Sequence, residues 1–146
     1  MNPKLFFIAA VLIPSLLDGV ITLVGQPSEY WADFSKIDEA APLTFLSFGP
    51  WVFLLSVLVY TAILAVILYK LPRWVSIGAG IFLCMAHSNG VQGWIAALVV
   101  ERMQYLYDYW WYISVVYSLI IALLVALGLR AWLQSEYTQK KRKSSH

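Results

Sequence analysis

Four long apolar stretches limit the folds open to this chain more than any other feature. They cover approximately residues 5–24, 50–69, 74–98 and 109–133. Each is close to the roughly 20 residues that a helix needs to cross the hydrocarbon core of a bilayer. Of the 146 residues, 61% are hydrophobic and 12% are charged, whereas a soluble domain carries about 25% charged residues. The sequence therefore predicts an all-α fold, a four-helix transmembrane bundle formed by residues 1–134.

The first stretch also has a feature of a secretory signal peptide, because Lys4 precedes its apolar run. The run is longer than the roughly 7–15 apolar residues of a signal peptide, and no small-x-small cleavage site follows it. We therefore expect it to be retained as a span. The last residues, 135–146, read "SEYTQKKRKSSH". This polar and basic composition predicts a disordered tail.

The distribution of lysine and arginine predicts the orientation of the bundle. Four spans place the N-terminus, the connection at 70–73 and the C-terminus on one side of the membrane. Eight of the ten basic residues fall on that side, namely Lys4, Lys70, Arg73, Arg130, Lys140, Lys141, Arg142 and Lys143. Cytoplasmic connections carry an excess of Lys and Arg. The sequence therefore predicts that both termini are cytoplasmic, in a bacterial inner membrane or a eukaryotic membrane.

The connection between the first two spans, residues 25–49, contains a pattern typical of a short helix on the outer surface. Tyr30 or Trp31, Phe34 and Ile37 recur at helical spacing. We expect these side chains to face lipid or protein. The opposite face, which includes Asp33 and Lys36, is then more exposed.

An aromatic cluster lies where the third and fourth spans meet the outer surface. It consists of Tyr105, Tyr107, Tyr109, Trp110, Trp111 and Tyr112. Tyrosine and tryptophan are enriched at membrane–water interfaces, so anchoring in the bilayer is the ordinary explanation. The density of rings exceeds what anchoring requires. We therefore keep open the hypothesis that a partner membrane subunit docks there.

Polar residues within the spans are the candidate functional residues, because ionisable groups in a membrane are costly. Asp18 lies 13 residues beyond Leu5, and His87 lies 13 residues beyond Trp74. Both spans enter from the cytoplasmic side. At about 1.5 Å per residue, both groups therefore lie roughly 20 Å into the membrane and are predicted to meet. We expect the segment "HSNGVQG" to face the bundle interior. The predicted polar cluster contains Asp18, Thr22, His87, Ser88, Asn89 and Gln92.

Three interpretations of this cluster stay open. The polar groups can be structural, as interhelical hydrogen bonds worth about 0.6–2 kcal/mol each. They can form a catalytic or metal site, for which Asp18, Glu39 and His87 supply oxygen and nitrogen ligands. They can also bind protons or a substrate. A fourth possibility is that Asp18 lies in a water-filled outer vestibule without a role.

The segments "LLDGVITL" and "DEAAPL" resemble a family of small, uncharacterised bacterial membrane proteins. That family has Leu-Leu-Asp and Thr-Leu in the first span and Glu-Ala-Asn-Pro-Leu after a short loop. The matching residues here are Leu16, Leu17, Asp18, Thr22, Leu23, Glu39, Ala40, Pro42 and Leu43, while Ala41 replaces the Asn. The resemblance covers the first third of the chain. It implies a helical membrane protein and no particular activity.

A carboxylate in the first of four spans is also similar to the arrangement in small multidrug-resistance exporters. In that family the acid of the first helix binds protons and cationic drugs, and the resemblance implies such a role for Asp18. Asp18 stands where a Glu is usual, and the outer connection of this chain is longer than in that family. The strong charge bias also opposes an antiparallel dimer of such exporters.

The sequence favours a small integral membrane protein that acts as a non-enzymatic accessory or structural subunit. The alternatives are an intramembrane enzyme built on Asp18, Glu39 and His87, and a small proton-coupled transporter that uses Asp18. No HExxH or CxxC motif is present, and the sequence specifies no cofactor or metal. We expect contacts with the lipid bilayer and with other membrane subunits. We expect none with nucleic acid, because the basic tail is explained by orientation.

Overall fold

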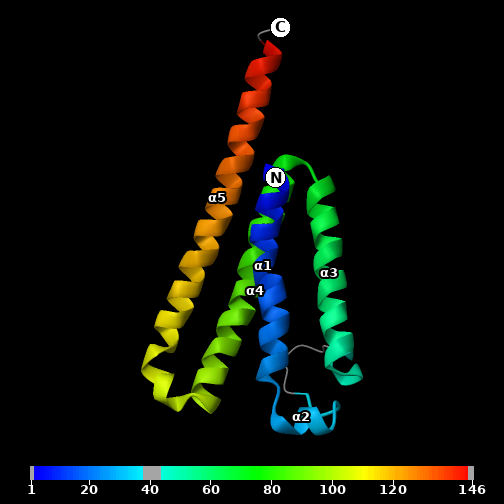
Figure 1. Cartoon of the computed structure of the whole chain (residues 1–146), viewed down its shortest axis with the longest axis vertical. Coiled ribbons are helices and arrows are strands. Elements are labelled where there is room, and N and C mark those ends of the chain that lie inside the picture. Colours follow the sequence, from blue (N-terminus) through cyan, green and yellow to red (C-terminus); the bar gives the residue numbers. More distant parts are fainter. Residues whose placement is uncertain (1, 38–43, 145–146) are drawn as a thin grey trace.

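The computed structural model describes residues 2–37 and 44–144, and helices are the regular secondary structure of this part of the chain. In chain order the elements are α1 (Pro3–Gly25), α2 (Ser28–Ala32), the 3₁₀ helix η1 (Thr44–Phe48), α3 (Pro50–Lys70), α4 (Arg73–Arg102), the 3₁₀ helix η2 (Gln104–Tyr109) and α5 (Trp110–Ser144). The predicted all-α class is confirmed (Figure 1).

The ends of the long helices follow from local chemistry. Asn2 caps α1, because its side-chain oxygen accepts a hydrogen bond from the Lys4 amide, and proline occupies the first position of the helix. Gly49 precedes α3 with a φ of 100°, a conformation that favours glycine, and Pro50 begins the helix. Pro72 separates α3 from α4, since it cannot supply the amide hydrogen that would continue α3.

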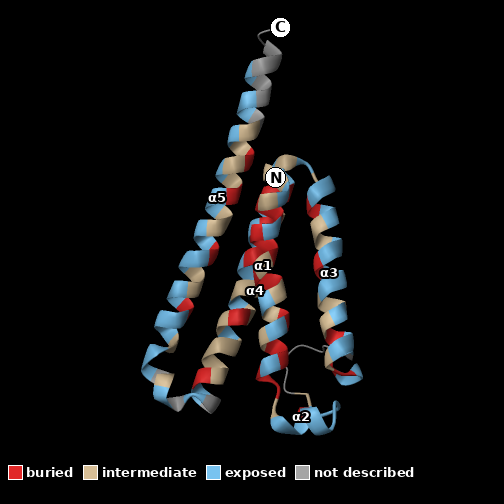
Figure 2. Ribbon diagram, viewed as in Figure 1, coloured by how far each residue is buried: buried red, intermediate tan, exposed pale blue. Residues whose placement is uncertain are grey.

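Helices α1, α3, α4 and α5 are each long and apolar enough to cross a membrane. α1 contacts the other three and is the most buried of them (Figures 1 and 2). The main core joins all four helices and contains Phe7, Ile8, Val11 and Leu12 of α1, Leu68 of α3, Ile77 and Cys84 of α4, and Ile121 and Trp132 of α5. Many large apolar side chains on the outer faces of α3, α4 and α5 stay exposed. Because lipid is the favourable surrounding for these faces, the chain is a small multi-pass membrane protein.

Close backbone contact joins α1 and α5 at one end of the bundle. A Cβ atom added to Gly128 would lie 2.8 Å from the Cα atom of Phe7. No larger residue fits there without separating the two helices, because real Cβ atoms do not approach so closely. Glycine at this position therefore determines how near α5 comes to the start of α1.

The N-terminus and the turn between α3 and α4 lie at the same end of the bundle, and α2 lies at the opposite end with the α4–α5 connection (Figure 1). The Lys4 ammonium donates hydrogen bonds to the carbonyl oxygens of Tyr69, at 2.7 Å, and Leu71, at 3.4 Å. It also lies 5.3 Å from the centre of the Trp132 ring. Lys4 thus ties the start of α1 to the end of α3 and to α5.

The outer connection contains a short helix, as predicted, but the helix is shorter than the sequence pattern suggested. α2 ends at Ala32, and a turn follows in which the Ser35 amide and hydroxyl donate to the Asp33 carboxylate. An aspartate that accepts such bonds competes with helical hydrogen bonding, which explains the early end. Tyr30 is fully buried and donates to the Leu46 carbonyl, whereas Phe34 is exposed. Ile37 packs against the same core cluster as Tyr30, and the Phe34 and Tyr30 ring centroids are 5.4 Å apart. Tyr30, Phe34 and Ile37 therefore share one side, although the regular helix ends at Ala32.

The tail is helical and not disordered as its composition predicted, because α5 continues to Ser144. It extends past the N-terminal end of the bundle (Figure 1). Gln, Glu, Lys and Arg are good helix formers, and a helix that already exists is extended without a new nucleation cost. Helix propensity, together with the continuation of α5, explains why the tail is helical although its composition predicted disorder.

Candidate functional site

Asp18 of α1 and His87 of α4 are in direct contact. The Nδ1 atom of His87 lies 2.9 Å from Oδ2 of Asp18. The side chains are 24% and 21% exposed, respectively. When Asp18 is ionised, its carboxylate only accepts hydrogen bonds, and the His87 Nδ1–H is then the donor. The meeting of these two residues, predicted from their equal depth, is confirmed.

Tyr60 of α3 extends this contact, and the sequence analysis missed it. Its hydroxyl lies 3.3 Å from Nε2 of His87, and the two rings meet edge to face with centroids 5.8 Å apart. When His87 is neutral, Nε2 accepts from the Tyr60 hydroxyl while Nδ1–H donates to Asp18. One continuous chain of hydrogen bonds therefore links α3, α4 and α1. Tyr60 lies ten residues from either end of α3, at mid-span, and this depth is the signal in the sequence by which it could have been found.

Gly90 makes the approach of Asp18 possible. A Cβ atom on Gly90 would lie 2.5 Å from Oδ1 and 2.9 Å from Cγ of Asp18. The carboxylate therefore occupies the space that a larger residue would fill. Glycine one turn after His87 lets α4 receive both oxygens of the acid, one near the imidazole and one against the helix backbone.

The site has no basic partner other than His87 within the described ranges 2–37 and 44–144, where no lysine or arginine lies within ion-pair distance of Asp18. With a neutral imidazole the site carries one negative charge, and with a protonated imidazole it is neutral overall. Uptake of one proton thus removes the net charge of the site.

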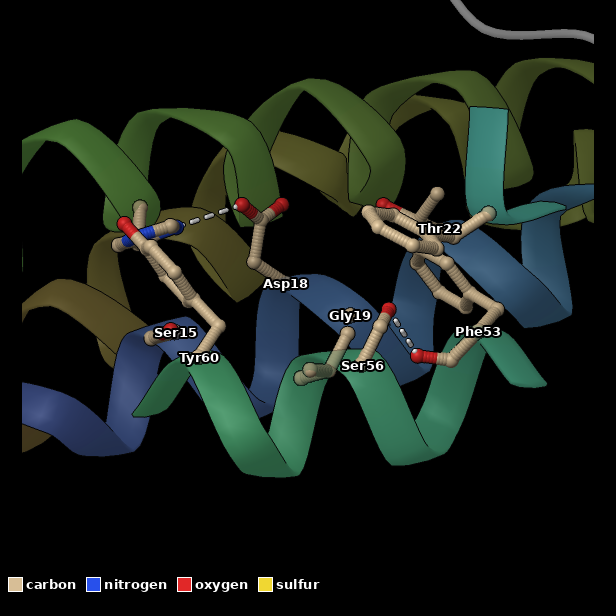
Figure 3. Close-up of a pocket in the computed structure, with 10 residues that line it drawn as sticks. Ser15, Asp18, Gly19, Thr22, Phe53, Ser56 and Tyr60 are labelled. Atoms are coloured by element: carbon tan, nitrogen blue, oxygen red, sulfur yellow. Dashed lines mark hydrogen bonds and ion pairs between the residues drawn. The ribbon is translucent and has the colours of Figure 1, made fainter. Parts of the chain in front are cut away.

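A cavity of about 320 Å³ borders this hydrogen-bond chain (Figure 3). α1 contributes Ser15, Asp18, Gly19 and Thr22, α3 contributes Phe53, Ser56, Val57 and Tyr60, and Phe45 and His87 complete the lining. The Ser56 hydroxyl donates a hydrogen bond within its own helix, to the Phe53 carbonyl. The cavity is mainly apolar, and its polar end is formed by Asp18, His87 and Tyr60.

Two other predicted site residues stand apart from this contact. Thr22 is buried one turn after Asp18 and lines the cavity, and its carbonyl accepts a hydrogen bond from Gln26. Glu39, the proposed third metal ligand, lies outside the described residues. Among the described residues, no three His, Cys, Asp or Glu side chains are grouped so that they could hold a metal ion.

Ser88 and Gln92 form a second polar cluster, between α4 and α5. The Gln92 amide donates to the Ser118 hydroxyl at 2.7 Å, and Ser118 donates to the Ser114 carbonyl. The Tyr117 hydroxyl donates to Ser88 at 3.3 Å. The segment "HSNGVQG" therefore contacts α5 as well as α1. Successive residues of a helix point about 100° apart, so one segment serves two interfaces.

Asn89 departs from the prediction, because it is exposed and does not face the bundle interior. It lies at the rim of a groove of about 540 Å³ between α4 and α5, together with Met85. Within residues 2–37 and 44–144, the Asn89 amide has no hydrogen-bond partner. It is 16 residues from Arg73 and 13 from Arg102 along α4, which places it near the middle of the membrane.

Four members of the aromatic cluster, Tyr105, Tyr109, Trp111 and Tyr112, are exposed, and Trp110 is partly buried. Tyr105 is 78% exposed, and the rings of Trp111 and Tyr112 stack with centroids 3.6 Å apart. The cluster spans η2 and the start of α5, at the end of the bundle opposite the N-terminus. This position agrees with an interfacial belt.

In comparisons with known proteins, the chain matches no protein-family model, no curated protein and no solved structure.

Proposed function

We propose that this multi-pass membrane protein is an accessory subunit that binds another membrane-embedded segment. Asn89 carries the proposal. An amide in the hydrocarbon region that lacks partners loses the hydrogen bonds it would make in water, a cost of several kcal/mol when nothing replaces them. A neighbouring transmembrane helix supplies such partners. The groove beside Asn89 gives that helix a polar and apolar surface to contact.

Photo-crosslinking in native membranes tests this function. A photoreactive amino acid at position 89 should form a covalent adduct with a protein, and the same probe at Leu58 serves as the matched control. Leu58 is 58% exposed on α3 and has only apolar side-chain atoms. Adducts with lipid alone at both positions would overturn the proposal.

We also propose that both termini are cytoplasmic. The support is the distribution of Lys and Arg, because eight of these ten residues fall on the side of the membrane that holds the two termini and two fall on the other side. The N-terminus lies at the same end of the bundle as the α3–α4 turn, as this orientation requires. The tail of α5, which is rich in Lys and Arg, then extends into the cytoplasm.

A second candidate function is a small proton-coupled transporter, and a specific contact favours it. The Tyr60–His87–Asp18 hydrogen bonds border a cavity and end at a carboxylate without a basic partner other than His87 among the described residues. The alternative of an enzyme built on Asp18, Glu39 and His87 stays a prediction, because Glu39 lies outside the described residues.

Replacing Asp18 by Asn distinguishes a structural role from proton coupling. The amide oxygen still accepts from His87 Nδ1–H, so a structural pair should lose about 1 kcal/mol or less. Proton flux into proteoliposomes, followed with an enclosed pH-sensitive dye, should fall to the level of empty vesicles in Asp18→Asn if the site couples protons. Equal flux in the wild type and the variant would overturn this second function.

A further inference from the structure

We propose that the outer face of α4 binds the same face of a second copy of this chain, with the two Asn89 side chains hydrogen-bonded to each other. This inference rests on the proposed function, because it names the segment that Asn89 contacts. It concerns a parallel pair of α4 helices related by a two-fold axis along the membrane normal.

The amide of Asn89 is self-complementary. It has one carbonyl oxygen that accepts and an NH₂ group that donates. Across a two-fold axis the same patch of each subunit meets itself, so a residue near the axis contacts its own copy. Each Asn89 carbonyl then accepts from the NH₂ group of the other, and both amides gain the partners that the described part of a single chain does not give them.

The depth of Asn89 is the same in both copies. The charge bias inserts every copy in one orientation. Asn89, about 24 Å along α4 from Arg73, therefore lies at one level in the membrane in each copy. A partner of different sequence would need its own polar group at this level, whereas a second copy has it necessarily.

The residues around Asn89 on α4 form a continuous outward face. Phe82 and Met85 are 70% and 68% exposed, and Gly93 is exposed with no atom within 4 Å of a Cβ built on it. Positions 82, 85, 89 and 93 are three or four residues apart and so lie along one side of the helix. A spacing of three and four residues is typical of helices that pack against each other with an interaxial angle of about 20°.

Nothing in the charge of this face opposes its pairing. The part of α4 from Trp74 to Val100 contains no Lys, Arg, Asp or Glu. The ionisable side chains in this part of α4 are Cys84 and His87. His87 is hydrogen-bonded to Asp18 and Tyr60 on the inner side of the helix. Two α4 helices can therefore approach without burying like charges.

Disulfide crosslinking in native membranes tests the pairing. Cys84 is the single cysteine, so a Cys84→Ala background allows Phe82→Cys, Met85→Cys and Asn89→Cys to be compared one at a time. We expect oxidation to give a covalent dimer of the chain at these positions. Leu58→Cys on α3 and Leu123→Cys on α5, which replace equally exposed leucines, should stay monomeric. Equal dimer formation at all five positions would overturn the inference.

The photo-crosslinking experiment at position 89 distinguishes a failure of this inference from a failure of the proposed function. It is done in the chain that keeps Cys84. A product with twice the mass of the chain supports the second-copy inference and the contact of Asn89 with another membrane-embedded segment on which it rests. A product only with a different protein overturns the second-copy inference and keeps the accessory function. Lipid adducts alone overturn both.

The strength of the pairing is measured by energy transfer between labelled copies in micelles. Asn89→Ala removes both hydrogen bonds of the pair and should weaken association roughly 8- to 800-fold, the equivalent of two interhelical hydrogen bonds of about 0.6–2 kcal/mol each. Asn89→Gln, which keeps the amide, should recover part of it. Unchanged association in Asn89→Ala would contradict the inference, provided circular dichroism shows the same helix content.

Discussion

His87 and Asp18 are 69 residues apart in the chain, and their side chains are 2.9 Å apart, between Nδ1 and Oδ2, inside the bundle. The contact joins the first helix to the third membrane-spanning helix. Tyr60 adds the second span through Nε2 of the same imidazole. One histidine thus links three of the four spans, and its loss affects the packing of all three.

Replacing Gly90 by Ala should destabilise the protein by about 1–3 kcal/mol, the cost of forcing an extra methyl group into a packed site. The new Cβ atom would lie 2.5 Å from Asp18 Oδ1 and would displace the carboxylate. Gly78→Ala is the control, because no atom lies within 4 Å of its Cβ position. It should be neutral or slightly stabilising. Unfolding by denaturant in detergent measures both, and equal stability of the two variants would contradict the geometry at Asp18.

Replacing Lys4 by Ala should loosen the contact between the start of α1 and the turn after α3. Its ammonium group donates to the carbonyls of Tyr69 and Leu71, at the negative end of the α3 dipole, and we expect a loss of about 1 kcal/mol. Lys70→Ala removes an exposed lysine from the same turn and is the control for charge. Thermal unfolding in detergent should rank Lys4→Ala below Lys70→Ala. The reverse order would show that the hydrogen bonds of Lys4 contribute nothing to stability.

The orientation is tested by two reporters. An enzyme reporter fused after His146 should be active in the cytoplasm, and one inserted beside Ser35 should be active outside, because the basic residues concentrate at the former side. If both report from one side, the number of spans between the two positions is even and the four-span orientation fails.

The turn after α2 should respond to acid. The amide and hydroxyl of Ser35 donate to Asp33 and lower the pKa of its carboxyl group. Because the folded pKa is below the unfolded value of about 3.9, this stabilisation is complete above that pH and is lost as the pH falls through the folded pKa. Ser35→Ala should raise the pKa of Asp33 toward its ordinary value. Carboxyl carbon chemical shifts followed against pH measure this change, and an unchanged pKa would contradict the hydroxyl contact.

Positions along the membrane normal were predictable from the sequence, because the rise of a helix is constant. Counting residues from the span ends brought Asp18 and His87 to the same depth, and the structure places them in contact. The same count placed the four spans within a few residues of α1, α3, α4 and the apolar part of α5. Depth is therefore the quantity that this sequence determines best.

The direction in which a polar residue points was less predictable. Asn89 follows the inward-facing His87 by two residues, or about 200° of rotation, and faces outward. The rotation of α4 about its axis depends on packing details such as Gly90 against Asp18, which no periodicity in the sequence reveals. Tyr60 was missed for a different reason. Tyrosine in a span is typical of the membrane–water interface, whereas Tyr60 lies at the middle of α3.

The central position of α1 has a consequence for the order in which the protein is made. α1 leaves the ribosome before α3, α4 and α5, the helices that cover it. Asp18 is synthesised 69 residues before His87, and an unpaired central Asp disfavours insertion by about 3 kcal/mol. The strongly apolar residues around it in α1 offset that cost. The first helix is thus inserted on its own hydrophobicity and becomes the template on which the later helices assemble.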